Sequence, residues 1–224
     1  TQANILNYEA VRFWQDMGAS RAILARELPI KDVAEIKSKV PDMELEAFCH
    51  GAMCIAYAGR CLMSAYLTGR SAQAGACSHT CRWDFDVLAD PAKAKELASS
   101  GALILREQKR PNDYFPVYEG DDFTAVLSSK DLRMIEHLKD MKDAGLDSIK
   151  IEGRMKSPEY VYTVTRIWRE LLNAGKGADQ EQMQQLSRAF SRGGFTDGYY
   201  RRRTGEGMLG VRSAEDKLAS GEME

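Results

Sequence analysis

The sequence predicts an α/β protein, and within that class a partial TIM-like (β/α) barrel with a Cys-rich insertion and a small β-hairpin region. The order strand, loop, helix recurs along the chain, which is typical of parallel strands joined by crossover helices. Polar residues follow each predicted strand directly, as at the C-terminal rim of a barrel, where active sites lie. A complete barrel needs about 250 residues, so this chain has room for about half of one.

The composition is that of an ordinary globular protein, with 44% apolar and 29% charged residues. The net charge is −2, so any contact with nucleic acid would need a local basic patch. The chain has no apolar run of about 18 residues and no secretory signal, so we expect a cytoplasmic protein without a membrane partner. Thr1 falls at what reads as the end of a strand, so we also expect the chain to start inside a longer protein.

The first helix is predicted over residues 7–17, within a segment 1–48 that we expect to form βα units of the barrel. Asn7 is a candidate N-cap, and Gly18 is a stop signal. Apolar residues recur at helical spacing between them, so the helix should bury one face. The residues of this face are Ala10, Phe13, Trp14 and Met17.

A strand and a second helix follow. The short apolar run 21–25 ends at Arg26 and Glu27, after which a proline opens an amphipathic stretch. Arg26 and Glu27 are candidate site residues, because they directly follow a predicted strand. A further strand over residues 43–48 leads to His50, the best acid/base candidate of the chain, although a structural histidine fits equally well.

Regular periodicity fails over residues 49–130. We interpret this segment as a Cys-rich insertion at the end of a strand, followed by small hairpins. A short helical piece is expected near residues 91–98, and alternating segments are expected around residues 102–106 and 115–127.

Regular βα units are predicted again over residues 131–176. Asp131 should cap a helix that ends before Gly145. A strand over residues 148–151 should follow, and Pro158 should begin the next helix. Three polar residues at the end of this strand are further candidate site residues, namely Lys150, Glu152 and Arg154.

The remaining segment, residues 177–224, turns polar. A Gln-rich helix is predicted near residues 179–190. The charged end of the chain is expected to be poorly ordered.

All five cysteines lie between residues 49 and 81, and such clustering is uncommon by chance. The candidate ligands are Cys54, Cys61, Cys77 and Cys81, which are separated by six, fifteen and three residues. Cys49 lies on a predicted strand, so we interpret it as a buried thiol.

The spacing leaves several interpretations of these cysteines open. Disulfides are disfavoured, because nothing marks the chain as secreted and the number of cysteines is odd. Structural zinc would accept four thiolates, or three with His50 or His79, but zinc sites usually contain C-x2-C pairs. A 4Fe-4S cluster takes thiolates from irregularly spaced loop positions, and nearby glycines would let backbone N–H groups approach it. Burial of several thiols without any ligand is the remaining alternative.

Longer motifs around the cysteines closely resemble the collagenase-like peptidase family of unknown catalytic type. The resemblance covers essentially residues 1–200. Its motifs are Glu46-Ala-Phe-Cys-His-Gly-Ala-Met-Cys54, Tyr57-Ala-Gly-Arg-Cys61-Leu-Met-Ser64, Gly75-Ala-Cys77, Cys81-Arg-Trp83, Ser129-Lys-Asp-Leu132 and Lys150-Ile-Glu-Gly-Arg154-Met-Lys-Ser157.

The resemblance implies a TIM-like barrel and one of two activities. Members of the family are known as proteases or collagenases, whereas other relatives are oxygen-independent hydroxylases. These hydroxylate a tRNA wobble uridine, a ribosomal RNA cytidine or a ubiquinone precursor, with a 4Fe-4S cluster and with prephenate as the hydroxyl donor. We therefore expect an iron–sulfur-dependent tRNA hydroxylase that forms 5-hydroxyuridine.

The resemblance also implies the ligands of the cluster. Cys54, Cys61 and Cys77 match family ligands. Some relatives have their last cysteine where this chain has Arg133, so Cys81 would be the fourth ligand here. Arg133 also points to the branch that hydroxylates the tRNA wobble uridine.

Two kinds of substrate contact follow from the expected reaction. A dicarboxylate such as prephenate would need cations at the barrel rim. The candidates are Arg26, Lys150, Arg154 and Lys156, although each could instead belong to a structural salt bridge. RNA would need basic and aromatic side chains around the insertion, although these could be dispersed surface charges and core aromatics. The candidates are Arg60, Arg70, Arg82, Lys109, Arg110, Tyr57, Tyr66 and Trp83.

A peptidase and a zinc-stabilised binding module without catalysis are the alternatives. The sequence contains no Gly-x-Ser-x-Gly elbow and no His-Glu-x-x-His helix, and we expect His137 to be solvated on a surface helix. Half a barrel would expose sheet edges and apolar strand faces. We therefore expect a homo-oligomer or a partner that supplies the missing barrel half.

Overall fold

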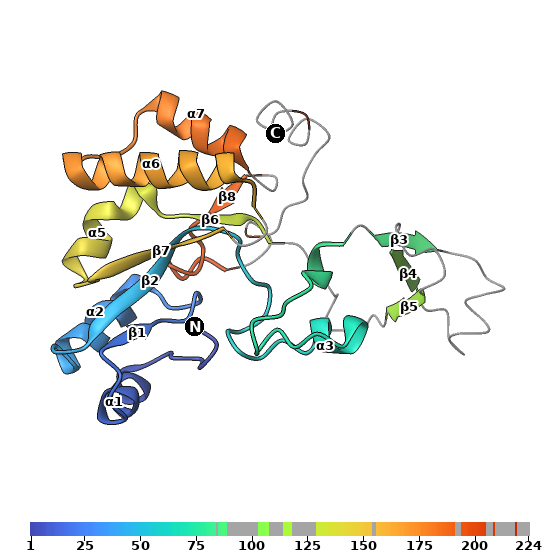
Figure 1. The fold of residues 1–224 in the computed structure, drawn as a ribbon, viewed down its shortest axis with the longest axis horizontal. Helices are drawn as coiled ribbons and strands as arrows, with labels where there is room; N and C mark the ends of the chain where they lie inside the picture. Colours follow the sequence, from blue (N-terminus) through green and yellow to red (C-terminus); the bar gives the residue numbers. More distant parts are fainter. Residues whose placement is uncertain are drawn as a thin grey trace. The chain divides into compact units, whose positions relative to one another are not determined.

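The computed structural model describes residues 1–83, 129–153, 156–190, 194–204, 208 and 218, together with the backbone of three strands between residues 85 and 117 (Figure 1). The chain divides into two compact units. The first unit contains Thr1–Cys61, Gln73–Gly75 and the described residues from Ser129 onward. The second contains Leu62–Ala72 and the described residues of Ala76–Ser128. The domain boundaries expected from the sequence stay predictions.

A five-stranded sheet forms the centre of the first unit. Its strands are β1 (Arg21–Ile23), β2 (Glu44–Gly51), β6 (Asp131–Arg133), β7 (Ser148–Glu152) and β8 (Phe195–Thr196). Strand β2 runs parallel to β1 along residues 44–46 and parallel to β7 along residues 46–51. It runs antiparallel to β6 at His50 and Gly51. Because these two residues pair with both β6 and β7, those strands lie on opposite edges of β2.

This sheet confirms the α/β class but not the partial barrel. A barrel of βα units contains only parallel strands, whereas the three-residue strand β6 runs against β2. In the part of the chain that the structure describes, the strands do not close into a barrel.

Five helices accompany the sheet in the described part of the first unit. They are α1 (Tyr8–Asp16), α2 (Ile30–Lys39), α5 (Leu138–Asp143), α6 (Pro158–Ala174) and α7 (Gln180–Ala189). Helix α6 follows its local signals closely: the Ser157 side chain accepts the Tyr160 N–H, a proline opens the first turn, and Gly175 ends the helix at φ 63°. Its buried residues, including Trp168, pack into one core with β2, β6 and α7. A second core joins α1 and α2 to β1 and β2.

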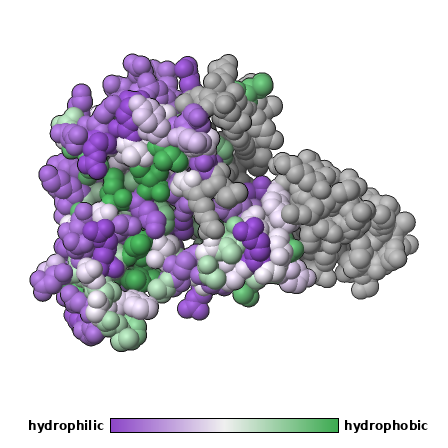
Figure 2. Space-filling view, viewed as in Figure 1, coloured by the Kyte–Doolittle hydropathy of each residue, from purple (hydrophilic) through white to green (hydrophobic). Residues whose placement is uncertain are grey.

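Helix α1 forms where the sequence predicts it but buries another face. Val11 is its buried residue, whereas Phe13, Trp14 and Met17 are 56%, 37% and 68% exposed. Tyr8, three residues before Val11, is partly buried against the same core. The predicted buried face was therefore wrong for these three exposed residues, whereas Ala10 is partly buried against the core. Helical spacing identifies apolar stripes but not which of them meets a neighbour. Figure 2 shows that the viewed face of this unit is largely hydrophilic, with apolar side chains visible between the helices.

The helix predicted to begin at Asp131 starts later. Asp131 opens strand β6, which is followed by a 3₁₀ helix, Ile135–His137 (η2), and then by α5. Leu132 and Arg133 pair with Gly51 and His50 of β2. This tertiary pairing overrides the local capping signal, so the predicted cap was wrong.

The second unit contains one short helix and a small sheet in its described part. Helix α3 (Met63–Thr68) packs against the 3₁₀ helix Thr80–Arg82 (η1). Strands β3 (Phe85–Leu88), β4 (Leu103–Glu107) and β5 (Tyr114–Val117) pair antiparallel in sequence order, as in the predicted hairpin region. The helical piece expected near residues 91–98 lies outside the described residues. None of the described helices is long and apolar enough to cross a membrane.

Candidate functional site

Charged side chains gather where strands β1, β2 and β7 end. The Arg26 guanidinium forms an ion pair with Glu152, with 2.7 Å between Nη2 and Oε2. It also lies over the Phe48 ring, 3.9 Å from the ring centroid. The two charged side chains are 15% and 24% exposed, so they are partly withdrawn from water. The sequence-predicted residues Arg26 and Glu152 therefore meet, as the salt-bridge alternative expected.

Lys150 belongs to the same face of the sheet. It pairs in register with Phe48, and its Nζ lies 5.3 Å from the centroid of that ring. Side chains alternate along a strand, so Lys150 and Glu152 of β7 share one face. No carboxylate among the described residues forms an ion pair with Lys150. Two cations thus lie near the Phe48 ring, and of these two only Arg26 forms an ion pair with a described carboxylate.

Glu27 anchors the beginning of the Cys-rich segment. Its Oε1 accepts the backbone N–H of Ala58 at 2.8 Å, and the Asn4 side chain donates to the carbonyl of Ala58. At the next residue, Gly59 has φ 73°, and a Cβ there would lie 2.2 Å from the carbonyl oxygen of Gln2. The loop between the first two candidate cysteines is therefore fixed closely against the N-terminal residues.

His50 faces another set of neighbours. Its ring is 1% exposed and lies among Tyr160, Trp168 and Phe195, with centroids 5.5 to 6.5 Å away. Neither ring nitrogen has a hydrogen-bond partner in the described structure. Burial and the nearby charge of Arg133 lower the pKa of His50 to about 3, so the ring is neutral near pH 7.

The position of His50 follows from an irregularity of β2. The pairing with β7 shifts register between Phe48 and His50, as at a β-bulge. At the next residue, Gly51 has φ 99°, and a Cβ there would lie 2.2 Å from the carbonyl oxygen of Glu152. The Tyr160 hydroxyl donates to that same carbonyl at 3.1 Å. This environment favours a structural His50, while its acid/base role stays a prediction. Arg154 lies outside the described residues.

The five cysteines are all free thiols. Cys49 is fully buried on β2, and its Sγ donates to the carbonyl oxygen of Lys150 at 3.4 Å. Burial raises its pKa well above the usual range, so it is a neutral thiol, as interpreted from the sequence. The four candidate ligands are half-buried, two in each compact unit: Cys54 and Cys61 in the first, Cys77 and Cys81 in the second. Within the described ranges, no group of three or more His, Cys, Asp or Glu side chains is arranged to hold a metal ion.

Two features around the four cysteines would stabilise their side chains as thiolate ligands of a metal cluster. The backbone N–H of His79 donates to Sγ of Cys77 at 3.3 Å, and such bonds to sulfur tune cluster ligands. Between Glu46 and Asp84 the chain contains three arginines and no acidic residue. Cationic surroundings favour thiolates, and four thiolates would give an iron–sulfur cluster a net negative charge. The residue types present therefore fit such a cluster.

His137 is buried, contrary to the expectation from its helix. It is 5% exposed, and its Nε2 lies 2.8 Å from Oδ2 of Asp197. The Tyr200 ring stacks on it, with centroids 5.0 Å apart. Its Nδ1 lies 3.4 Å from Asp140 and 3.5 Å from Arg201. The expectation was wrong because the chain after β8 covers η2, which ends at His137, and the sequence offered no signal for that contact.

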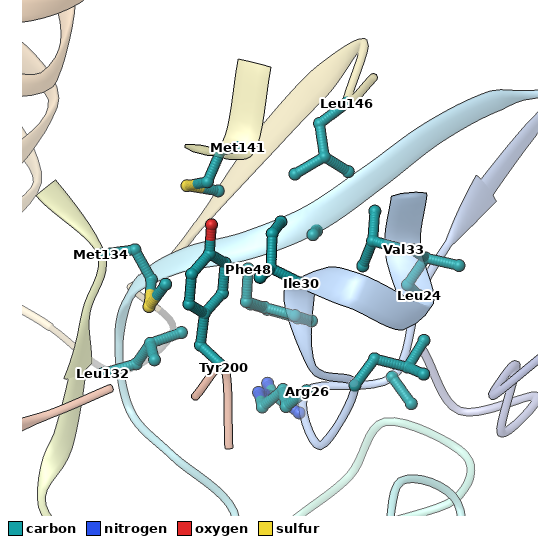
Figure 3. Close-up of a pocket in the computed structure, with 13 residues that line it drawn as sticks. Leu24, Arg26, Ile30, Val33, Phe48, Leu132, Met134, Met141, Leu146 and Tyr200 are labelled. Atoms are coloured by element: carbon teal, nitrogen blue, oxygen red, sulfur yellow. The ribbon is translucent and has the colours of Figure 1, made fainter. Parts of the chain in front are cut away.

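A narrow cavity lies beside the charged face (Figure 3). It has a volume of about 30 Å³ and is lined mainly by apolar residues of the first unit. Arg26 lies on its wall, and the Tyr200 ring points into it. The Tyr200 hydroxyl is buried and has no hydrogen-bond partner among the described residues. Such a space holds about one water molecule, so it is no substrate pocket.

Comparisons with known proteins identify the family. The model of peptidase family U32 matches residues 1–209. The chain is 36% identical to tRNA hydroxylation protein P of Escherichia coli over 91% of its own length and 50% of that protein. It is 41% identical to tRNA hydroxylation protein P1 of Bacillus subtilis over 78% of the chain and 36% of that protein. It is 36% identical to a collagenase of Porphyromonas gingivalis over 89% of the chain and 46% of that protein.

The extent of these matches confirms the resemblance recognised in the motifs. The chain spans about half the length of the first curated relatives that it matches. No solved structure matches it. Since the family model covers nearly the whole sequence, the chain belongs to peptidase family U32.

Proposed function

We propose that the protein containing this chain hydroxylates a tRNA uridine without dioxygen, using a 4Fe-4S cluster held by Cys54, Cys61, Cys77 and Cys81. The observation that carries the reaction is the 36% identity to a tRNA hydroxylation protein over 91% of the chain. Free thiols in a segment without acidic residues support the cofactor. When bound, the cluster would supply the electron transfer that side chains alone cannot perform.

The charged face of the first unit supports prephenate as the hydroxyl donor. Lys150 carries an uncompensated positive charge over Phe48, and Arg26 adds a second cation on the same ring. Ammonium and guanidinium groups bind carboxylates through charge-assisted hydrogen bonds. We assign the donor carboxylates to Lys150 first, because the ion pair with Glu152 already engages Arg26.

A collagenase-like peptidase is the second candidate, and the similar collagenase favours it. A peptidase would need a nucleophile beside a base. The two buried histidines do not provide that arrangement in the described structure. His50 has no hydrogen-bond partner there, and both nitrogens of His137 face Asp or Arg side chains. These two histidines therefore give the peptidase candidate no support within the described residues.

Zinc bound to the same thiols without catalysis is the third candidate. Metal analysis of anaerobically purified protein separates it from the proposal. We expect about four irons per chain. One zinc and no iron would support the binding module instead.

Nucleoside mass spectrometry tests the proposed reaction. Transfer RNA from cells lacking the gene should lose the nucleosides derived from 5-hydroxyuridine. Reintroduction of the gene should restore them. Unchanged nucleosides in the deletion strain would contradict the proposal, and gelatin cleavage by the purified protein would favour the peptidase.

A further inference from the structure

The second unit presents one strongly exposed aromatic side chain. Tyr66 of α3 is 85% exposed, and Leu62 at the helix N-cap is 71% exposed. These residues lie four positions apart, so they share one face of the helix. Figure 2 shows apolar and hydrophilic side chains side by side over the α3 region. Large exposed apolar groups that share one face often mark an interaction surface.

The opposite side of α3 is fixed by hydrogen bonds within the unit. Ser64 is buried, and its Oγ donates to the carbonyl of Arg70 at 2.7 Å. The same Oγ accepts the backbone N–H of Ser78 at 3.0 Å. Thr68 Oγ1 lies 2.8 Å from Ser78 Oγ and donates to the carbonyl of Ser64 at 2.7 Å. These hydrogen bonds fix the backbone of α3, which carries Tyr66. A partner that binds Tyr66 would therefore not have to order this backbone.

Among the second unit's described side chains, in residues 62–72 and 76–83, the charged ones are Arg70 and Arg82. Arg70 follows α3 directly and is exposed, and no described carboxylate forms an ion pair with it. Arg82 lies in η1, which packs against α3. The segment from residue 47 to residue 83 contains no Asp or Glu, although the whole chain has 33. An exposed aromatic ring and an exposed arginine four residues apart in the sequence are complementary to a polyanion that carries flat aromatic groups.

We propose that Leu62, Tyr66 and Arg70 form a docking surface for unpaired nucleotides of RNA. A base stacks on the Tyr66 ring, and Arg70 contacts the phosphate backbone. Exposed bases stack on aromatic side chains in most single-stranded RNA recognition, and arginine neutralises phosphates. This inference rests on the proposed function, since it locates part of the tRNA contact of the same enzyme.

Binding of unmodified tRNA to the full-length protein, measured by fluorescence anisotropy at several salt concentrations, tests the surface. Tyr66→Ala should weaken binding about tenfold or more, whereas Tyr66→Phe should bind like the wild type. Tyr162→Ala is the matched control, because Tyr162 is 68% exposed on α6 of the first unit. Arg70→Ala should lower the slope of log affinity against log salt by about one, whereas the exposed Arg169→Ala should leave it unchanged.

The metal content and the oligomeric state of each variant are measured in parallel, so that a loss of tRNA binding can be distinguished from misfolding or a change in assembly. Each variant should contain as much metal as the wild type, because an exposed side chain does not support the fold. Tyr66→Leu, which keeps apolar bulk but has no ring, should bind as weakly as Tyr66→Ala.

Three outcomes would overturn the inference. If Tyr66→Ala and Arg70→Ala bind tRNA like the wild type, this surface is not the docking surface, and the proposed function is untouched. If Tyr66→Ala changes only the oligomeric state, a second copy of the chain occupies the surface. If the wild type binds no tRNA, the proposed function fails as well.

Discussion

The buried, unprotonated His50 should make the protein less stable toward unfolding in mild acid. Its pKa is about 3 in the folded protein against 6.5 for a free histidine, because folding buries the ring without a partner. Between these values the unfolded chain binds one more proton than the folded chain, so stability falls as the pH falls below 6.5. Each pH unit in this window costs about 1.4 kcal/mol, which gives a loss of about 2 kcal/mol between pH 6.5 and pH 5.

Urea unfolding at pH 7.5, 6.5, 5.5 and 5.0 measures this loss. Carboxylates contribute to any acid dependence, so the informative quantity is the difference between the wild type and His50→Leu. Leucine keeps an apolar side chain among Tyr160 and Trp168 but cannot titrate. The variant should show a pH dependence smaller by about 2 kcal/mol over this range. Equal pH dependence of the two proteins would refute the reasoning, and His50 would then be solvated or hydrogen-bonded.

Two further predictions concern the same strand ends. Gly51→Ala should destabilise the protein by about 2 kcal/mol or more in thermal unfolding, because φ is 99° and the new Cβ would meet the carbonyl of Glu152 at 2.2 Å. The control Gly177→Ala meets no atom within 4 Å, and equal effects of the two changes would contradict the packing argument. Lys150→Gln should raise the apparent Kd for prephenate about tenfold or more without unfolding the protein. Isothermal titration measures this, and an unchanged Kd would remove Lys150 from the donor site.

Local signals explain what the sequence predicted well. Helix α6 begins after Ser157-Pro158 and ends at Gly175, and each of these residues acts through its own backbone geometry. Strand β2 is likewise found where the sequence predicts a strand over residues 43–48, although it extends to Gly51. Features that depend on the neighbouring few residues could therefore be read from the sequence.

Features that depend on distant partners could not. Asp131 carries a capping signal, but pairing of Leu132 with β2 makes the segment a strand. His137 was expected on a solvated surface helix, yet it ends η2, and Asp197 and Tyr200 of a later segment contact it. Such contacts are chosen by tertiary packing, which local patterns do not contain.

The candidate site shows the same division. Polar residues after strands indicated Arg26, Lys150 and Glu152, and the structure brings these together around one ring. The ring itself, Phe48, had no signal beyond its strand position. The His50 side chain has different neighbours from Phe48 because the pairing of β2 with β7 shifts register between these two residues. Hydrophobic periodicity alone does not reveal such a shift.

The central claim is that the four half-buried cysteines, and not the fully buried Cys49, hold a cluster that tRNA hydroxylation requires. Rescue of a deletion strain with single variants tests it most directly, with 5-hydroxyuridine-derived nucleosides and bound iron measured in parallel. Cys54→Ala, Cys61→Ala, Cys77→Ala and Cys81→Ala should each abolish both signals, whereas Cys49→Ala should retain both. Loss of iron in Cys49→Ala together with its retention in Cys81→Ala would contradict the proposed ligands, and nucleosides restored by all five variants would contradict the claim as a whole.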